Sequence, residues 1–216
     1  MKIYVVGNSK NRFLPLNNIR EKFLIDKKHD GDNIDSLNPW YCELTGLYYL
    51  WKNVNDDIVG LEHYRRYFVN KKNQILSENE IKSMLSKSDI ICIKASNYSK
   101  TKPVITWINQ NKKRLDFDKF LIFCKYYVGK DYYNECWKIL RGDYHILGNM
   151  FICKKELIDE YCKFIFDVLF MYQEAEKSFG RKLPGRIMGY FTEFLFAAWI
   201  KMNNKTVWWA QWKKTR

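Results

Sequence analysis

Short apolar runs alternate with helical patterns along the first half of the chain, and this alternation limits the fold more than any other feature. Runs typical of β-strands occupy residues 2–7, 57–61 and 89–94. Helical patterns begin between them, at Pro39 and at Glu78. Strands that alternate with helices predict layers of helices around a largely parallel sheet. We therefore expect an α/β fold with a mostly parallel central sheet flanked by helices.

The first two helices carry recognisable start signals. Asn38 can cap a helix over residues 39–53, and Pro39 suits its first turn. Ser77 and Glu80 have the spacing of a capping box for the second helix. Both helices should pack an apolar face against the sheet.

The second half of the chain is richer in helical patterns. The expected helices and strand are residues 118–128, 132–141, 145–153 (the strand), 155–177 and about 186–201. Residues 206–212 combine tryptophans with nearby lysines, which is also the composition of an anchor at a membrane interface. A strand packed on the core is the interpretation that we rank first.

Length, cysteines and hydropathy favour one domain over residues 1–216. A chain of 216 residues with 47% hydrophobic content can bury one sizeable core but not two generous ones. The six cysteines lie far apart without metal-site spacing, which indicates buried thiols in a reducing compartment. No stretch approaches the ~18 apolar residues of a membrane span, and the first apolar run is too short for a signal peptide. We expect a cytoplasmic protein, which could rest on the inner face of the membrane.

The charge balance favours a partner that carries phosphate or other anionic groups. There are 37 basic and 24 acidic residues, a formal net charge of +13. A basic nucleic-acid-binding protein is one alternative, because cations and stacking rings bind single strands. Most aromatic residues, however, lie within apolar helical and strand runs, which argues against nucleic acid as the partner.

The strand at 57–61 ends abruptly in charged residues. In open α/β sheets, ligands bind at the carboxyl ends of the strands. Arg65 and Arg66 could hold a diphosphate through bidentate contacts, and His63 could donate to the same oxygens. Glu62 could bind a sugar hydroxyl or a metal ion. The alternative is a solvated basic pair beside a structural histidine, and the position after a buried strand makes the two interpretations about equal.

A polar loop precedes the helix at 39–53. Asp32 and Asn33 could bind uridine or ribose hydroxyls, because their side chains donate and accept at short reach. A turn followed by a helix cap would explain Asn38 equally well.

Two further clusters carry polar groups next to apolar elements. Asp143, His145 and Asn149 flank the strand at 145–153 and could face an acceptor sugar. A second cluster shares one helical stripe: Arg186, Gly189, Tyr190 and Glu193. A carboxylate on so apolar a helix is either paired with an arginine, or a general base with a raised pKa.

Four segments together resemble a known family: NPWYCELTGLYYLWKN, DIVGLEHYRRYF, LGNMFICKKELIDEYC and R-x-x-G-Y-x-x-E. In order and spacing they are similar to the bacterial capsular polysaccharide synthesis glycosyltransferases, once catalogued as a domain of unknown function. The segments span residues 38 to about 200. HYRRYF together with NPWYCELT is the most specific part.

The resemblance implies a GT-A-like fold and transfer of a hexose from a nucleotide-diphosphate donor. The donor would be a UDP-sugar, with UDP-galactofuranose as one option because some relatives are assigned as galactofuranosyltransferases. The acceptor would be a capsular or surface polysaccharide that could be lipid-linked. A non-catalytic scaffold of a membrane-bound polysaccharide assembly is the remaining alternative.

The resemblance and the residues together give a set of expected site residues. Donor binding is expected at Asp32, Asn33, Asn38, His63, Arg65 and Arg66. Acceptor binding is expected at His145, Asn149, Arg186 and Tyr190. Glu193 or Asp143 would take the proton of the acceptor hydroxyl.

The need for a metal ion is left open by the sequence. Many GT-A enzymes carry a metal-binding Asp-x-Asp at the place that His63, Arg65 and Arg66 would occupy here. Two arginines can neutralise a leaving diphosphate without Mg²⁺ or Mn²⁺, whereas an aspartate pair needs the ion.

Overall fold

A mixed eight-stranded sheet forms the centre of the computed structural model, which describes residues 1–94, 104–111, 113–142 and 146–214. Its strands are β1 (Lys2–Gly7), β2 (Arg20–Leu24), β3 (Ile58–His63), β4 (Arg66–Val69), β5 (Ile90–Lys94), β6 (Ile146–Lys154), β7 (Val207–Trp209) and β8 (Gln211–Lys214). The main path runs β2-β1-β3-β6-β5-β7. Along this path only β6 runs against its neighbours, so the expected mostly parallel sheet is confirmed.

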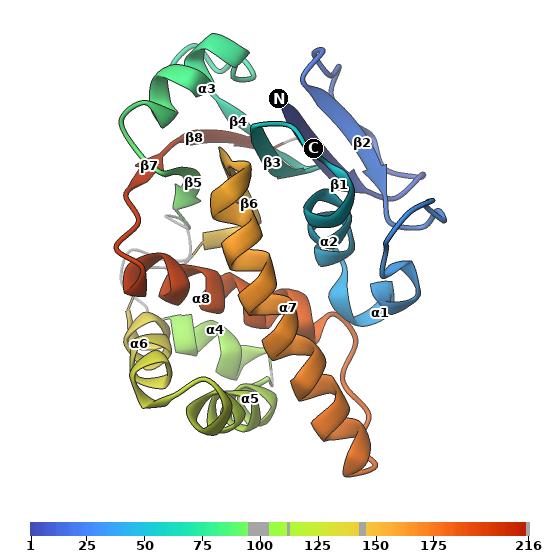
Figure 1. Ribbon diagram of the computed structural model, residues 1–216, viewed down its shortest axis with the longest axis vertical. Helices are drawn as coiled ribbons and strands as arrows, with labels where there is room; N and C mark the ends of the chain where they lie inside the picture. Colours follow the sequence, from blue (N-terminus) through green and yellow to red (C-terminus); the bar gives the residue numbers. More distant parts are fainter. Residues whose placement is uncertain (95–103, 112, 143–145, 215–216) are drawn as a thin grey trace.

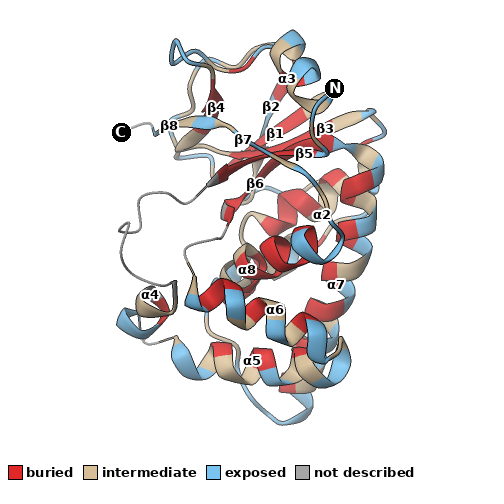
Figure 2. Ribbon diagram, turned by 90° about the vertical axis from the view of Figure 1, so that its left-hand side faces the viewer, coloured by how far each residue is buried: buried red, intermediate tan, exposed pale blue. Residues whose placement is uncertain are grey.

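Helices cover the two faces of the sheet unequally (Figures 1 and 2). They are η1 (Asp35–Leu37), α1 (Asn38–Tyr41), α2 (Leu44–Asn53), α3 (Glu78–Leu85), α4 (Val104–Gln110), α5 (Arg114–Tyr127), α6 (Lys130–Arg141), α7 (Lys155–Ser178) and α8 (Ile187–Met202). One face carries α2, α7 and α8, with α5 and α6 packed beyond them. The other face carries α3.

Alternation along each strand divides the apolar side chains between two cores. Val59 and Leu61 of β3 point into the larger core, which the helices around α7 and α8 complete. Ile91 of β5 and Ile152 of β6 point into the smaller core, where Ile81 of α3 joins them. Successive side chains of a strand face opposite sides, so a buried strand reads as a continuous apolar run.

The expected helix over residues 39–53 is two helices instead of one. Cys42 adopts φ 51° and ψ −122°, which no α-helix tolerates, so α1 ends before it and α2 starts after Glu43. Asn38 is the first residue of α1 and makes no capping hydrogen bond. The expected cap is therefore wrong, whereas the capping box of Ser77 is present at α3.

The C-terminal tryptophans belong to strands, as ranked first from the sequence. β7 pairs with β5, and β8 pairs with β4, although Trp208 and Trp209 remain partly exposed. The sequence pattern missed β2, β4 and α4. All six cysteines are free, and all except Cys42 are buried. No helix within the described ranges is long and apolar enough to span a membrane.

A buried ion pair ties the parallel strands together. Arg20 of β2 reaches across β1 and donates from Nε and Nη2 to the two carboxylate oxygens of Glu62, at 2.8 and 2.9 Å. Its Nη1 donates to the carbonyl of Leu76, and Glu62 also accepts the backbone N–H of Phe68. Both charged side chains are fully buried. The pair therefore fixes β2, β3, β4 and the approach to α3 relative to one another.

Removing one partner of this pair should strongly destabilise the fold. Arg20→Ala leaves the carboxylate of Glu62 buried without its guanidinium, which typically costs about 3–5 kcal/mol. Urea denaturation measures this free energy of unfolding. Lys2→Ala is the control, because the Lys2–Glu21 pair is partly exposed and should contribute about 1 kcal/mol or less. Equal losses for the two variants would contradict the role assigned to Arg20.

Candidate active site

The charged segment after β3 forms a tight hairpin at the carboxyl edge of the parallel strands. β3 ends at His63, which pairs with Arg66 at the start of β4. The N–H of Tyr64 donates to the carbonyl of Val6 at 2.9 Å, so the hairpin also closes over the end of β1. The expectation that this segment lies at the carboxyl end of a strand is confirmed.

Glu62 and His63 point to opposite faces of the sheet because they are neighbours in a strand. Glu62 lies in the ion pair with Arg20, and its carboxylate accepts three hydrogen bonds from protein groups. The suggestion that Glu62 binds a metal ion or a sugar hydroxyl is thus corrected: its oxygens are already occupied, and the residue is buried.

His63 is surrounded by guanidinium groups. Burial, followed by the charges of Arg66, Arg65 and Arg186, lowers the pKa of His63 to about 3. The imidazole is therefore neutral at physiological pH. Its Nδ1 faces the backbone N–H of Arg65 at 3.4 Å, which leaves the proton on Nε2 as a donor.

The two arginines of the hairpin lie near different aromatic rings. The guanidinium of Arg65 lies 5.2 Å from the ring of Tyr64, and its buried Nε has no hydrogen-bond partner among the described residues. The guanidinium of Arg66 lies 6.0 Å from the ring of Trp212. It also passes close to Gly148, where an added Cβ would lie 3.4 Å from Nη1 of Arg66.

A left-handed kink in β6 brings its backbone toward these cations. Gly148 and Asn149 have φ angles of 66° and 54°, and the pairing with β5 is irregular at this point. The N–H of Gly148 donates to Glu193 at 3.1 Å. The amide of Asn149 donates to Glu43 at 3.0 Å and to the carbonyl of Gly189 at 3.2 Å. The kink thus joins the start of α2 to α8.

Two carboxylates lie together in this cluster. Burial raises the pKa of Glu43, and burial followed by the charge of Glu43 raises the pKa of Glu193 to about 8. Arg66 and Arg186 act in the opposite direction on both carboxyls. Of the two alternatives for Glu193, the raised pKa favours an acid–base group over a simple ion pair.

Arg186 lies at the start of α8 and not within it. Its φ of 65° is left-handed, and its N–H donates to the carbonyl of Pro39. The exposed side chain reaches Cys42 and lies 6.0 Å from the ring of Tyr190. The stripe expected from the sequence is therefore present, although its first member precedes the helix.

Asp32 and Asn33, in the polar loop before α1, lie apart from the two carboxylates. Asp32 accepts from the hydroxyl of Tyr48 and exchanges hydrogen bonds with Asn53, at the far end of α2. Asn33 is held by carbonyl groups of its own loop. A ten-residue helix is about 15 Å long, which separates this loop from Glu43. Of the expected donor residues, the structure thus places these two apart from His63.

The remaining expected residues divide between the cluster and the undescribed part of the chain. Asn38 lies in α1 next to Pro39, and its Oδ1 is buried without a hydrogen-bond partner among the described residues. Asp143 and His145 lie outside the described residues.

Glu43 is the main site residue that sequence reasoning missed. It stands within the conspicuous segment NPWYCELT, where the pattern of a continuous helix concealed its position at a helix break. The signal available in the sequence was a carboxylate between Cys42 and Leu44, within a largely apolar segment where an unpaired charge is costly. Gly189 of α8 lies directly beside it, because a Cβ there would be in ordinary van der Waals contact with the carboxylate, at 3.5 Å.

The donor set allows only part of a metal site. No group of three or more histidine, cysteine, aspartate or glutamate side chains comes together within the described ranges. Glu43 and Glu193 could supply two carboxylate ligands. Mg²⁺ is commonly held by one or two carboxylates together with substrate phosphates, so these residues fit an ion that arrives with its substrate.

Comparison with known proteins places the chain in a family. Residues 2–205 match the family described as a domain of unknown function (DUF4422). The chain belongs to this family. A search of curated proteins found no match for it.

One solved structure shares the fold of this DUF4422 domain. It is described as the apo structure of the WbbM bifunctional glycosyltransferase, with a TM-score of 0.79 and 20% sequence identity. The alignment covers 99% of the DUF4422 chain and 45% of the WbbM chain. At this identity the likeness establishes the fold, which therefore resembles that of a glycosyltransferase.

The raised pKa of Glu193 should make stability depend on pH. The unfolded chain ionises this carboxyl above about pH 4, whereas the folded chain keeps the proton until about pH 8. The free energy of unfolding therefore falls as pH rises through this window. Glu193→Gln should reduce this fall, by at most about 1.4 kcal/mol per pH unit for one proton.

Thermal and urea unfolding between pH 4 and 9 would measure the effect. Glu174→Gln removes an exposed carboxylate of α7 and should leave the pH dependence as in the unmodified protein. Parallel curves for Glu193→Gln and the unmodified protein would contradict a raised pKa at Glu193.

Proposed function

We propose that this DUF4422 domain is a glycosyltransferase of the hexosyltransferase type. Its donor would be a nucleotide-diphosphate sugar, with a UDP-sugar such as UDP-galactofuranose as first choice, and its acceptor a capsular or surface polysaccharide. The observation that carries the proposal is the cluster of Arg65, Arg66 and Arg186 around a neutral histidine, next to two carboxylates. The fold shared with WbbM is consistent with this chemistry.

On the donor side, the arginines would hold the diphosphate. Guanidinium groups match phosphate oxygens in a bidentate manner, and they remain charged at every relevant pH. His63 adds a neutral donor, because its Nε2–H can donate a hydrogen bond to a phosphate oxygen. Asn38 remains a candidate for the nucleoside because its Oδ1 is buried and has no hydrogen-bond partner among the described residues. Asp32 and Asn33 would take part only if the nucleoside extends along α2.

On the acceptor side, Glu193 is the proposed base. The acceptor hydroxyl oxygen would attack the anomeric carbon while the carboxylate of Glu193 takes the hydroxyl proton. The bond from that carbon to the phosphate oxygen breaks, and its electron pair leaves with the diphosphate. Asn149, Arg186 and Tyr190 would orient the acceptor, whereas Asp143 and His145 remain proposals from the sequence alone.

Loss of an arginine should stop transfer without unfolding the chain. Arg65→Ala removes a donor to the leaving diphosphate, and removal of one such donor typically lowers kcat by about 10²–10³-fold. Release of UDP from a panel of UDP-sugars with an oligosaccharide acceptor measures this. Lys177→Ala is the control, because Lys177 is an exposed cation in the last turn of α7 and its partner Glu174 is exposed too. Full activity of folded Arg65→Ala would overturn the donor assignment.

The same assay decides the metal question. Activity that survives EDTA would show that the arginines suffice for the diphosphate. Activity that is lost with EDTA and restored by Mn²⁺ or Mg²⁺ would assign a bound cation to the substrate complex.

The two carboxylates should differ in how they change the pH–rate profile. If Glu193 is the base, kcat/KM should rise with pH toward about 8, and Glu193→Gln should be inactive at every pH. Glu43→Gln removes a like charge that raises the pKa of Glu193, so the rise should move to lower pH. Activity lost in Glu43→Gln and retained in Glu193→Gln would instead make Glu43 the base.

A further inference from the structure

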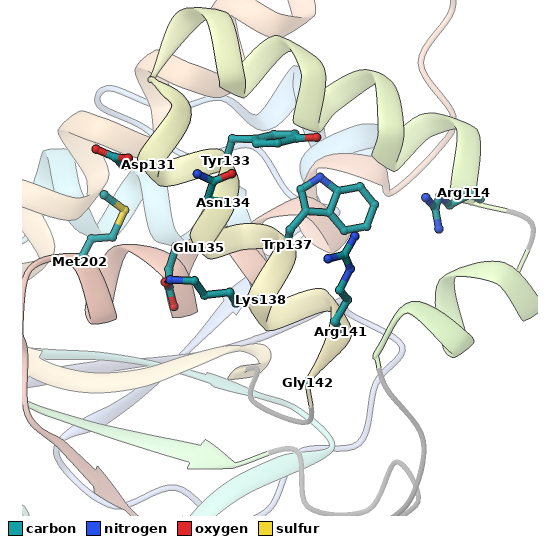
Figure 3. Close-up of a pocket in the computed structure, with 10 residues that line it drawn as sticks. All are labelled: Arg114, Asp131, Tyr133, Asn134, Glu135, Trp137, Lys138, Arg141, Gly142 and Met202. Atoms are coloured by element: carbon teal, nitrogen blue, oxygen red, sulfur yellow. The ribbon is translucent and has the colours of Figure 1, made fainter.

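A polar pocket lies along α6, and most of its lining residues belong to that helix (Figure 3). Its volume is about 1070 Å³. One end is formed by Arg114 at the start of α5, together with Trp137, Arg141 and Gly142 at the end of α6. None of these four residues is among those assigned to the candidate active site.

One indole ring organises the basic end of the pocket. The guanidinium carbons of Arg114 and Arg141 both lie 5.1 Å from the ring centre of Trp137. Asp118 occupies Nε of Arg114, which leaves its terminal nitrogens. No ion pair of Arg141 occurs among the described residues. The indole Nε1 is buried and has no hydrogen-bond partner within the same ranges.

Two guanidinium groups meet at one ring: Asp118 pairs with that of Arg114, and no carboxylate pairs with that of Arg141 among the described residues. The guanidinium carbons lie at most about 10 Å apart, which is near the screening length of about 8 Å at physiological ionic strength, so part of their repulsion survives screening. Of the acidic residues that line the pocket, Glu135 is engaged by Lys138 and Lys201. Asp131 lies ten residues before Arg141 on α6, a separation of about 15 Å along the helix. An anion between the arginines would relieve their repulsion.

The chemistry of the arginines selects the kind of anion. An aromatic ring holds a guanidinium group by cation–π attraction, so less side-chain freedom is lost when its N–H fork binds. Two such forks from different helices suit a group with several oxygens, such as a phosphate or diphosphate. We propose that the pocket binds a phosphate-bearing ligand, with its phosphate held between Arg114 and Arg141 beside Trp137.

The pocket adjoins the candidate active site through one step of the chain. Lys113 lies 4.9 Å from the ring of Tyr190 in that site, and Arg114 is its neighbour in the pocket. A phosphate on the acceptor could therefore be held while its sugar reaches Glu193, an interpretation that rests on the proposed function. Binding itself does not depend on it.

Two tryptophans allow both sites to be followed in one titration. In ¹⁵N-labelled protein the indole N–H of Trp137 reports on the pocket, and that of Trp212 reports on the environment of Arg66. Trp137→Phe and Trp212→Phe assign the two signals. Pyrophosphate should shift the Trp137 signal in a saturable manner, also in an Arg65→Ala background. A shift of Trp212 alone would favour the donor site and overturn the pocket proposal.

A matched pair of arginine variants separates specific binding from general charge. Arg141→Gln should weaken pyrophosphate binding at Trp137 by about tenfold or more, since it removes charged hydrogen bonds. Arg12→Gln changes the net charge equally and removes an exposed arginine of the loop after β1, which forms no ion pair among the described residues. It should leave the titration unchanged. Equal weakening in both variants, or no shift of Trp137 at all, would overturn the proposal.

A second experiment distinguishes a lipid phosphate from a soluble one. Vesicles of phosphatidylglycerol are compared with vesicles of phosphatidylcholine in a flotation assay. Flotation with phosphatidylglycerol that pyrophosphate reverses, and that Arg141→Gln abolishes, would support the site and assign it to lipid phosphate. Pyrophosphate binding without flotation would support the site and assign it to a soluble phosphate. Neither the titration nor the flotation assay requires transferase activity, so both can be interpreted even if the proposed function is wrong.

Discussion

The buried pair of Arg20 and Glu62 is the interaction on which the geometry of the candidate site depends. A carboxylate at the end of β3 would be costly inside the sheet without a partner, and Arg20 supplies one from across β1. The same carboxylate accepts the N–H of Phe68 and so holds β4 in place. The turn between β3 and β4 carries Arg65, with Arg66 beginning β4. The Arg20–Glu62 pair on one face of the sheet therefore holds in place the hairpin that carries Arg65 and Arg66.

The donor side of the candidate site carries more positive than negative charge. Burial, followed by the charges of Arg66, Arg65 and Arg186, lowers the pKa of His63, while burial raises the pKa of Glu193 and keeps its proton in place near neutral pH. Such a site gains by admitting a diphosphate, because the anion lowers the repulsion among the cations. An incoming anion would also hold the proton on Glu193 more tightly. Binding of the donor therefore works against deprotonation of Glu193. The arginines reduce this conflict because they stabilise both anions.

Much of the fold could be predicted because apolar runs report burial directly. The strands β1, β3, β5 and β6 and the helices from α5 onward follow from periodicity within a few residues. β2 was not found because two of its five residues, Glu21 and Lys22, are exposed and charged. The site was only partly predictable: the hairpin of Arg65 follows a strand in sequence, whereas Glu43 meets Glu193 only through tertiary structure. No local pattern indicates that a loop residue such as Asp32 folds back along α2.

Backbone strain gives a separate reason to place the site here. Among described residues other than glycine, positive φ angles occur at Cys42, Asn73, Asn149, Arg186 and Asn204. Three of these five surround the two carboxylates, and Gly148 next to them is also left-handed. Such conformations cost on the order of 1–3 kcal/mol each for a residue with a side chain, and they persist where the surroundings enforce them. The fold therefore accepts strain at the positions that bring these side chains together.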